Sequence, residues 1–192
     1  MWVGALGPRL TRAMAGIADG VIVHPFVTAE VVRDHTLVRL AEGLESSGRH
    51  RSDLTLVVGA IVATSSDEET LERATRAARA NVAFYASTPA YRLTLDQHGL
   101  GDLQPRLREL TRRGDWARLA DLVDDEVLDL VAVRGTPAEA AAELHRRYGA
   151  VADRLALTVA PPTRDEDLAA LTAAWRTPAP APRGRLDGAG PT

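Results

Sequence analysis

The first 26 residues constrain the fold more than any other stretch, because they predict a complete strand–helix–strand unit. Residues 2–6 and 20–24 are short apolar segments suited to strands, and a helix is expected between them from Pro8 onward. Proline is well placed in the first helical turn, where its missing N–H costs nothing. A crossover through a helix joins parallel strands and is almost always right-handed. The chain is therefore expected to begin as part of a parallel α/β sheet.

The turn between this first strand and its helix is a candidate binding site. Its residues are Gly4, Ala5, Leu6, Gly7 and Pro8, followed by Arg9. Glycines let a ligand approach the backbone closely, and the free N–H groups at a helix N-terminus attract a phosphate. We predict that these six residues bind the phosphate of a cofactor. The alternative is an ordinary strand-to-helix turn, since Gly-Pro pairs occur in many loops.

His24 is the candidate catalytic residue. It ends the second predicted strand, and barrel enzymes place their working residues at the carboxyl ends of strands. An imidazole there can donate a hydrogen bond to a cofactor ring or substrate, or act as a general acid. The alternative is a structural histidine bonded to the backbone. Tyr85, Tyr91 and Trp116 are candidates for the wall of a substrate site, although packing among helices explains them more simply.

The rest of the chain alternates strands with helices. Residues 54–63 form an unbroken β-branched apolar run, which predicts a strand covered on both faces, and residues 154–160 predict the last strand. Residues 87–130 predict a helical insertion, expected to act as a mobile cap, and the Pro/Gly/Ala-rich residues 177–192 predict a disordered tail. About four parallel strands with helices fit either an open sheet or part of a (β/α)8 barrel.

Composition excludes several classes of function. The chain has no cysteine, which excludes disulfides, thiolate metal sites and a cysteine nucleophile, and its basic residues are all arginine. A net charge of −3 argues against a nucleic-acid-binding surface. The histidines lack metal-ligand spacing, so no metal is predicted. Without a membrane-spanning apolar run or a signal-peptide pattern, we predict a cytoplasmic protein that binds no membrane.

Several segments together resemble the luciferase-like monooxygenase superfamily and, within it, the coenzyme F420-dependent oxidoreductases. They are WVGALGPRLTR, GIADGVIVHPF, FYASTPAYR, GTPAEAAAEL and DRLALTVAPP, in this order over residues 2–162. The resemblance implies a (β/α)8 TIM barrel that binds coenzyme F420, or alternatively FMN, at the carboxyl ends of its strands. It also implies hydride transfer to or from a small organic substrate.

The resemblance extends only to the carboxyl-terminal half of such a barrel, here residues 1–176. A complete barrel takes roughly 250 residues, whereas this chain has 192. Four strands cannot close, so two strand edges and part of the inner apolar surface are expected to stay open. Val57, Val58, Ile61, Leu155 and Leu157 lie in runs typical of strands buried on both faces, and part of their surface is expected to be exposed in an open half-barrel.

An open half-barrel needs a covering partner. We expect a homodimer, or pairing with a separate amino-terminal half, because exposed apolar surface drives association. The alternative to an enzyme is a non-catalytic half-barrel that acts by association with another chain.

Overall fold

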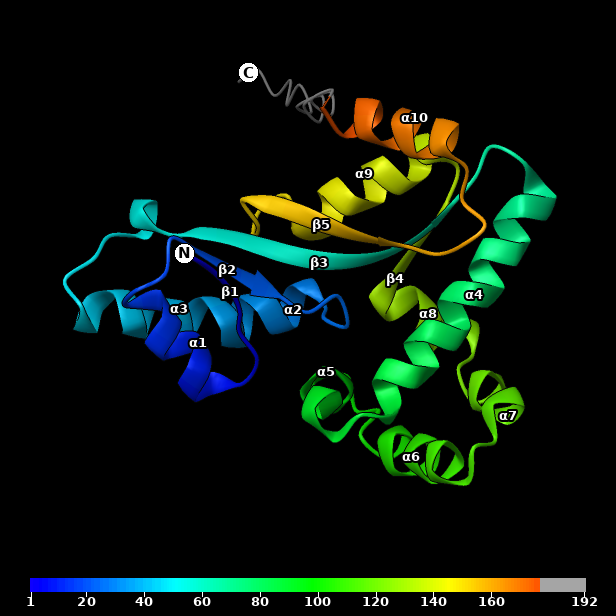
Figure 1. The fold of residues 1–192 in the computed structure, drawn as a ribbon, viewed down its shortest axis with the longest axis horizontal. Coiled ribbons are helices and arrows are strands. Elements are labelled where there is room, and N and C mark those ends of the chain that lie inside the picture. Colours follow the sequence, from blue (N-terminus) through cyan, green and yellow to red (C-terminus); the bar gives the residue numbers. More distant parts are fainter. Residues whose placement is uncertain (177–192) are drawn as a thin grey trace, which may run out of the picture.

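The structure is a computed structural model that describes residues 1–176, apart from the side chain of Ala117. It contains a parallel sheet flanked by helices (Figure 1). The strands are β1 (Trp2–Gly4), β2 (Gly20–Val23), β3 (Thr55–Thr64), β4 (Ala132–Gly135) and β5 (Arg154–Val159). All of their pairings are parallel. The predicted α/β fold with a parallel, unclosed sheet is confirmed.

β4 is an addition to the four strands predicted from the sequence. It has four residues and follows directly after helix α8 (Asp125–Val131). The apolar positions of α8 continue into Ala132 and Val133, so periodicity gives no sign of the change from helix to strand. Pairing with residues 61–64 of β3 is what holds this segment extended.

β3 is the central strand and has neighbours along both edges. Along one edge of β3, residues 57–62 pair with β5. Along the opposite edge, residues 55–58 of β3 pair with β2 and residues 61–64 pair with β4. β1 pairs only with β2, and β5 only with β3, within the part of the chain that the structure describes. Each of these outer strands therefore has an open edge, and the sheet does not close.

The strand–helix–strand unit at the start forms as predicted. α1 (Pro8–Ala15) connects β1 to β2 and packs on a long helical segment that follows β2. That segment consists of α2 (Ala29–Val31), the π-helical turn η1 (Val32–Thr36) and α3 (Leu37–Ser46). Gly43 allows the close approach of the two helices, since a Cβ there would lie 2.1 Å from the carbonyl oxygen of Arg12. A short 3-10 turn, η2 (Arg51–Asp53), then precedes β3.

One face of the sheet, the outer face, is covered by helices. These are α1, α3, α9 (Pro137–Tyr148) and α10 (Asp165–Arg176). Leu56 and Val58 of β3 are fully buried beneath them. Tyr148 of α9 is buried as well, and its hydroxyl donates a hydrogen bond to the carbonyl oxygen of Val27 at 3.0 Å. Burial raises the pKa of Tyr148 to about 12.

A buried carboxylate attaches α10 to the loop after β3. Asp167 accepts hydrogen bonds from the hydroxyls of Ser65 and Ser66 at 2.9 and 2.8 Å. It also accepts one from the guanidinium of Arg164 at 3.0 Å. Burial alone would raise the pKa of Asp167, but these hydrogen bonds outweigh it and hold the pKa far below its ordinary value. Asp167 is therefore an ionised anchor.

A second helical group packs on the opposite, inner face at the carboxyl end of β3. Its members are α4 (Glu68–Ser87), the 3-10 turn η3 (Pro89–Tyr91), α5 (Arg92–Gln97), α6 (Leu103–Arg113), α7 (Trp116–Asp121) and α8. Their apolar side chains enclose Phe26 together with Ile61 and Ala63 of β3. Figure 1 shows α5, α6 and α7 gathered around the far end of α4.

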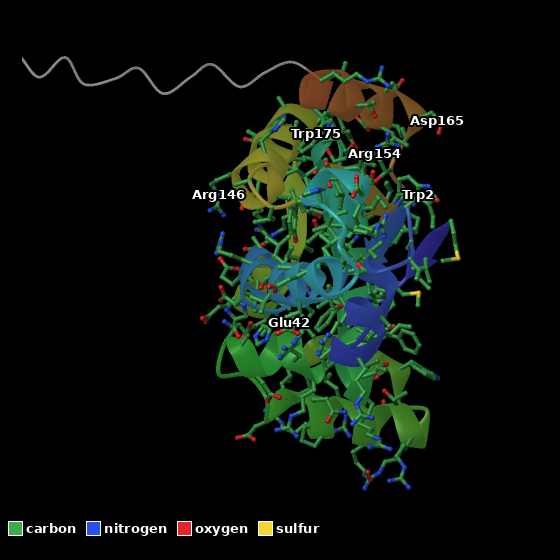
Figure 2. The ribbon with its side chains drawn as sticks, turned by 90° about the vertical axis from the view of Figure 1, so that its left-hand side faces the viewer. Trp2, Glu42, Arg146, Arg154, Asp165 and Trp175 are labelled. Atoms are coloured by element: carbon green, nitrogen blue, oxygen red, sulfur yellow. The ribbon has the colours of Figure 1, made fainter. Side chains whose placement is uncertain are left out.

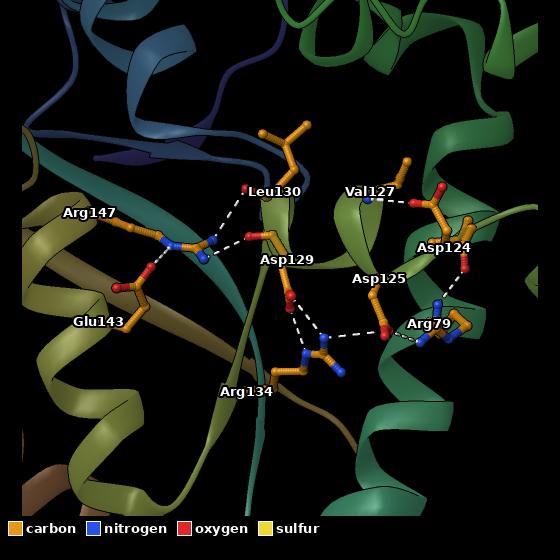
Figure 3. A network of polar contacts seen from close by, with 10 residues as sticks. Arg79, Asp124, Asp125, Val127, Asp129, Leu130, Arg134, Glu143 and Arg147 are labelled. Atoms are coloured by element: carbon orange, nitrogen blue, oxygen red, sulfur yellow. Dashed lines mark hydrogen bonds and ion pairs between the residues drawn. The ribbon is translucent and has the colours of Figure 1, made fainter.

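Ion pairs join this second group to β4 and α9 (Figure 3). Arg79 of α4 pairs with Asp125, and Arg134 of β4 contacts both Asp125 and Asp129 of α8. Arg147 of α9 donates a hydrogen bond to the carbonyl oxygen of Asp129 at 2.7 Å. These contacts connect α4, β4 and α9 to α8.

The inner face of β1, β2 and β5 is open in residues 1–176. Trp2 is 48% exposed and Ile22 is 37% exposed, and Ala156 is also exposed. The Trp2 ring lies against Gly20, and the Arg154 guanidinium lies 5.6 Å from the ring centre (Figure 2). The expected open surface is present.

The residues expected on that surface differ from those observed. The expected partial exposure does not fall on Val57, Val58 or Ile61, because all three are buried. Val58 points to the outer face, and the second helical group covers Ile61. Leu155 and Leu157 are partly buried against the core of the outer face. The exposed side chains of this face belong instead to β1, β2 and alternate positions of β5.

Candidate functional site

A cleft of about 370 Å³ opens between the start of α1, the end of β2, the turn η1 and the turn η3. Its apolar wall includes Val23, Phe26, Val27, Val31 and Leu93. Its polar lining includes Thr11 of α1, His35 and Thr36 of η1, Arg39 of α3 and Thr94 of α5. This lining is suited to a ligand that carries an anionic group on an apolar body.

A second cavity of about 380 Å³ lies on the inner face. Gly4, Gly59 and Ala156 form part of its lining, with Ile22 and Thr158 beside them. The space above Gly4 and the exposed Ala156 is open, whereas Pro25 packs directly on Gly59, where a Cβ would lie 2.6 Å from the Pro25 nitrogen. A flat ring can lie in that open space.

The predicted phosphate-binding turn separates the two cavities. Gly7 and Pro8 line the cleft, Gly4 lines the inner cavity, and Ala5 and Leu6 line both. Gly7 has φ = 82°, a conformation that residues with a side chain rarely adopt. A Cβ on Gly4 or Gly7 would meet no atom within 4 Å. The turn therefore presents open backbone at the start of a helix, as a phosphate site requires.

His24 follows directly after β2 and lines both cavities. Its Nδ1 accepts a hydrogen bond from the backbone N–H of Phe26 at 3.1 Å, which assigns the proton of the neutral ring to Nε2. Burial lowers the pKa of His24, so the ring is neutral near pH 7. No hydrogen bond to Nε2 forms among residues 1–176. A neutral imidazole with a free Nε2–H can donate to a ligand in either cavity.

Two tyrosines contact the His24 ring. Tyr91 stacks on it, with ring centroids 4.1 Å apart and 15° between the planes. Tyr85 meets it edge to face at 4.6 Å and 84°. Tyr91 lines both cavities, whereas Tyr85 packs within the second helical group. Trp116 is 57% exposed and lines neither cavity.

Hydrogen bonds attach α5 to the segment that follows β2. Thr94 Oγ1 donates to the carbonyl oxygen of Phe26 at 2.9 Å, and Thr28 Oγ1 lies 3.0 Å from His98 Nε2. Four residues of the predicted insertion (residues 87–130) line one or both cavities: Ala90, Tyr91, Leu93 and Thr94. α6 and α7 pack on α4 instead. The cavity wall is thus a short stretch of the insertion, and motion of the whole insertion remains a prediction.

His35, Thr36 and Arg39 are cleft residues that were missed from the sequence. The π-helical turn η1 inserts an extra residue per turn and so sets which side chains face the cleft. The four-residue spacing of His35 and Arg39, which places them on one helical face, was the available signal. Arg39 pairs through Nη1 with Glu42 at 2.7 Å. Arg9, by contrast, is exposed and lines neither cavity.

Residues 1–176 contain neither a membrane-spanning helix nor a cluster of metal ligands. None of their helices has the length and apolar character needed to cross a membrane. Nor do they contain a group of three His, Asp or Glu residues arranged to bind a metal ion.

Sequence comparisons place these features in a family. Residues 1–154 match the family model for luciferase-like monooxygenase. An uncharacterized protein of Mycobacterium tuberculosis is 39% identical over 155 residues, which are 81% of this chain and 46% of that protein. The 5,10-methylenetetrahydromethanopterin reductase of Archaeoglobus fulgidus is 30% identical over 146 residues, which are 71% of this chain and 41% of the reductase.

Solved structures show the same fold. The coenzyme F420-dependent tetrahydromethanopterin reductase from Methanopyrus kandleri aligns with a TM-score of 0.71 at 20% identity, over 90% of this chain and 48% of the reductase. An F420-dependent secondary alcohol dehydrogenase in complex with an F420–acetone adduct aligns with a TM-score of 0.53 at 16% identity, over 81% and 42%. The chain thus spans less than half the length of the relatives it matches. The resemblance seen in the sequence is confirmed: this chain belongs to the luciferase-like monooxygenase family.

Proposed function

We propose that this chain is the cofactor-binding half of an oxidoreductase that uses coenzyme F420 for hydride transfer to or from a small organic substrate. The observation that carries the proposal is the open backbone turn of Gly4–Pro8, with a cavity on each side and His24 between them. Relatives named as F420-dependent enzymes favour this cofactor, and FMN is the alternative.

The residues around the turn fit such a cofactor. Gly4 and Ala156 in the inner cavity leave open space above the strands, where a planar ring fits. The start of α1 offers N–H groups to a phosphate, and no side chain caps this helix. Arg9 on the first turn and Arg39 in the cleft supply positive charge. When bound, the cofactor supplies the hydride chemistry, and the protein supplies binding and orientation.

His24 is assigned the catalytic role on the protein side. Its Nδ1 is held by the N–H of Phe26, so the Nε2–H points away from that contact and is free to donate. A hydrogen bond from Nε2 to a ring or substrate carbonyl would stabilise negative charge that develops there. The same atom can deliver a proton as a general acid.

Fluorescence titration with F420 and FMN tests this function. Gly4→Leu is the informative variant, because the added side chain enters open space in the inner cavity rather than the core. We expect it to weaken binding at least tenfold, whereas the exposed Phe84→Ala variant binds as the wild type does. Failure of both ligands to bind, even with the amino-terminal half of a homologous enzyme supplied, would favour the non-catalytic half-barrel.

The open inner face supports a second proposal, that this chain works in association with a second copy of itself. Trp2, Ile22 and Ala156 are exposed there, and β1 and β5 each have an open edge. A surface of this kind favours association. A separate amino-terminal half is the alternative occupant. Sedimentation equilibrium should show a dimer. A stable monomer with F420-dependent turnover would contradict the need for either a second copy or a separate amino-terminal half on the inner face.

A further inference from the structure

Tyr91 occupies the boundary between the two cavities. It lines both of them, as does His24, and the two rings stack at 4.1 Å. At this separation nothing else fits between the rings. A ligand that reaches this face of the imidazole must therefore take the place of the tyrosine ring.

The backbone on both sides of Tyr91 is fixed by hydrogen bonds, whereas its side chain is held by ring contacts alone. On one side, Gln104 Nε2 donates to the carbonyl oxygen of Ser87 at 2.9 Å. On the other side, Thr94 Oγ1 donates to the carbonyl oxygen of Phe26. The Tyr91 hydroxyl makes no hydrogen bond to any residue within 1–176. Ring contacts with His24, Phe26 and Tyr85 are what hold this side chain in place.

We propose that Tyr91 is a gate. In the stacked position its ring covers His24 and closes the passage between the cleft and the inner cavity. When the ring rotates away, the two cavities join and a planar aromatic ligand stacks on His24 in its place. The test below has two arms. The first uses no cofactor and does not depend on the proposed function, whereas the second uses F420 and FMN and rests on it.

The first arm measures access to His24 without any cofactor. Diethylpyrocarbonate acylates neutral imidazole nitrogens, and peptide mass spectrometry gives the rate at each histidine relative to the exposed His50. We expect Tyr91→Ala to raise the rate at His24 about three- to tenfold, the factor by which an aromatic pair of this kind is stabilised. Tyr91→Phe keeps the stacked ring and should leave the rate unchanged.

Two controls separate gating from unfolding. Phe84→Ala removes an exposed aromatic ring of α4 that lines neither cavity, and it should not change the rate at His24. Circular dichroism should show that Tyr91→Ala retains the wild-type fold. An unchanged His24 rate in a folded Tyr91→Ala variant would overturn the gate, as would an equal rise in Tyr91→Phe.

The second arm measures association of F420 and of FMN by stopped-flow fluorescence. Tyr91→Ala should raise the association rate constant by a similar three- to tenfold factor, because no ring has to be displaced. Unchanged or slower association would overturn the gate and make Tyr91 a fixed wall. If no variant binds either ligand while the His24 rates follow the first arm, the proposed function fails and the gate stands.

Discussion

The two faces of the sheet differ, although the same strands form both. On the outer face, Val21, Leu56 and Val58 are fully buried beneath α1, α3, α9 and α10. On the inner face, Trp2 and Ile22 are exposed and the second cavity lies against the strands, whereas the cleft opens beyond the end of β2, between α1 and η1. The outer face is therefore covered by packed helices, whereas the inner face supplies open surface for binding wherever the second helical group does not cover it. The predictions below test this division.

The largest expected effect is the difference in unfolding free energy lost by two variants at neighbouring residue pairs of β2 and β3, one pair on each face of the sheet. Leu56 pairs with Val21 toward the outer face, and Ile22 pairs with Val57 toward the inner face. Leu56→Ala should lower the free energy of unfolding by about 3 kcal/mol, because it leaves a cavity in packed core. Ile22→Ala should cost about 1 kcal/mol or less, since part of its surface is already in water.

Urea denaturation at low protein concentration measures both costs. Equal costs for the two variants would contradict the division between the faces. A cost for Ile22→Ala that grows with protein concentration would show that a second copy covers the inner face.

The next effect concerns Asp167, which attaches α10 to the outer layer. Asp167→Asn should cost about 2 kcal/mol near pH 7, because buried donors lose a charged acceptor. The pKa of Asp167 is lower in the folded than in the unfolded chain. Its contribution is therefore present above pH about 4 and is lost as the pH falls through the folded-state pKa.

Thermal unfolding of wild type and Asp167→Asn from pH 7 to pH 2 follows this change. The stability difference between them should shrink in acid. A difference that stays constant with pH would exclude the ionised form as its source. Asp102→Asn, at an exposed position, serves as the control.

The smallest effect compares two tyrosine hydroxyls. Tyr148 donates a buried hydrogen bond on the outer side, and the Tyr91 hydroxyl has no partner within residues 1–176. Tyr148→Phe should cost about 1 kcal/mol, and Tyr91→Phe close to none. The same denaturation assay measures both, and similar losses would show that Tyr91 has an unrecognised anchor.

Local signals were enough to predict the strand–helix–strand unit and the central strand. Pro8 acts within a few residues of where it lies, and α1 begins there. β4 could not be predicted, because only its pairing with distant residues 61–64 keeps it extended. Tertiary contact overrides local periodicity in a segment this short.

The candidate site was predicted only in part, again because local sequence signals reveal some of its residues and tertiary packing determines the others. The Gly4–Pro8 turn and His24 have sequence signals that depend on adjacent residues, and the structure brings them together at the two cavities. Tyr91 was one of three aromatic candidates for the wall of the site, and the structure places it alone of the three at the cavities, while Arg39 was missed. Only the packing of α3 and η3 brings these two side chains to the same place. The π-helical turn η1 adds a change of helical phase that a 3.6-residue period does not predict.

Hydrogen exchange with and without F420 tests most directly whether the cofactor binds at the carboxyl end of the inner face. Saturating F420 should slow exchange in residues 4–8, 24–28 and 89–94, and should leave α9 and α10 unchanged. Protection centred on α9 and α10, or no protection at the turn while F420 remains bound, would contradict the assignment of this face as the binding surface.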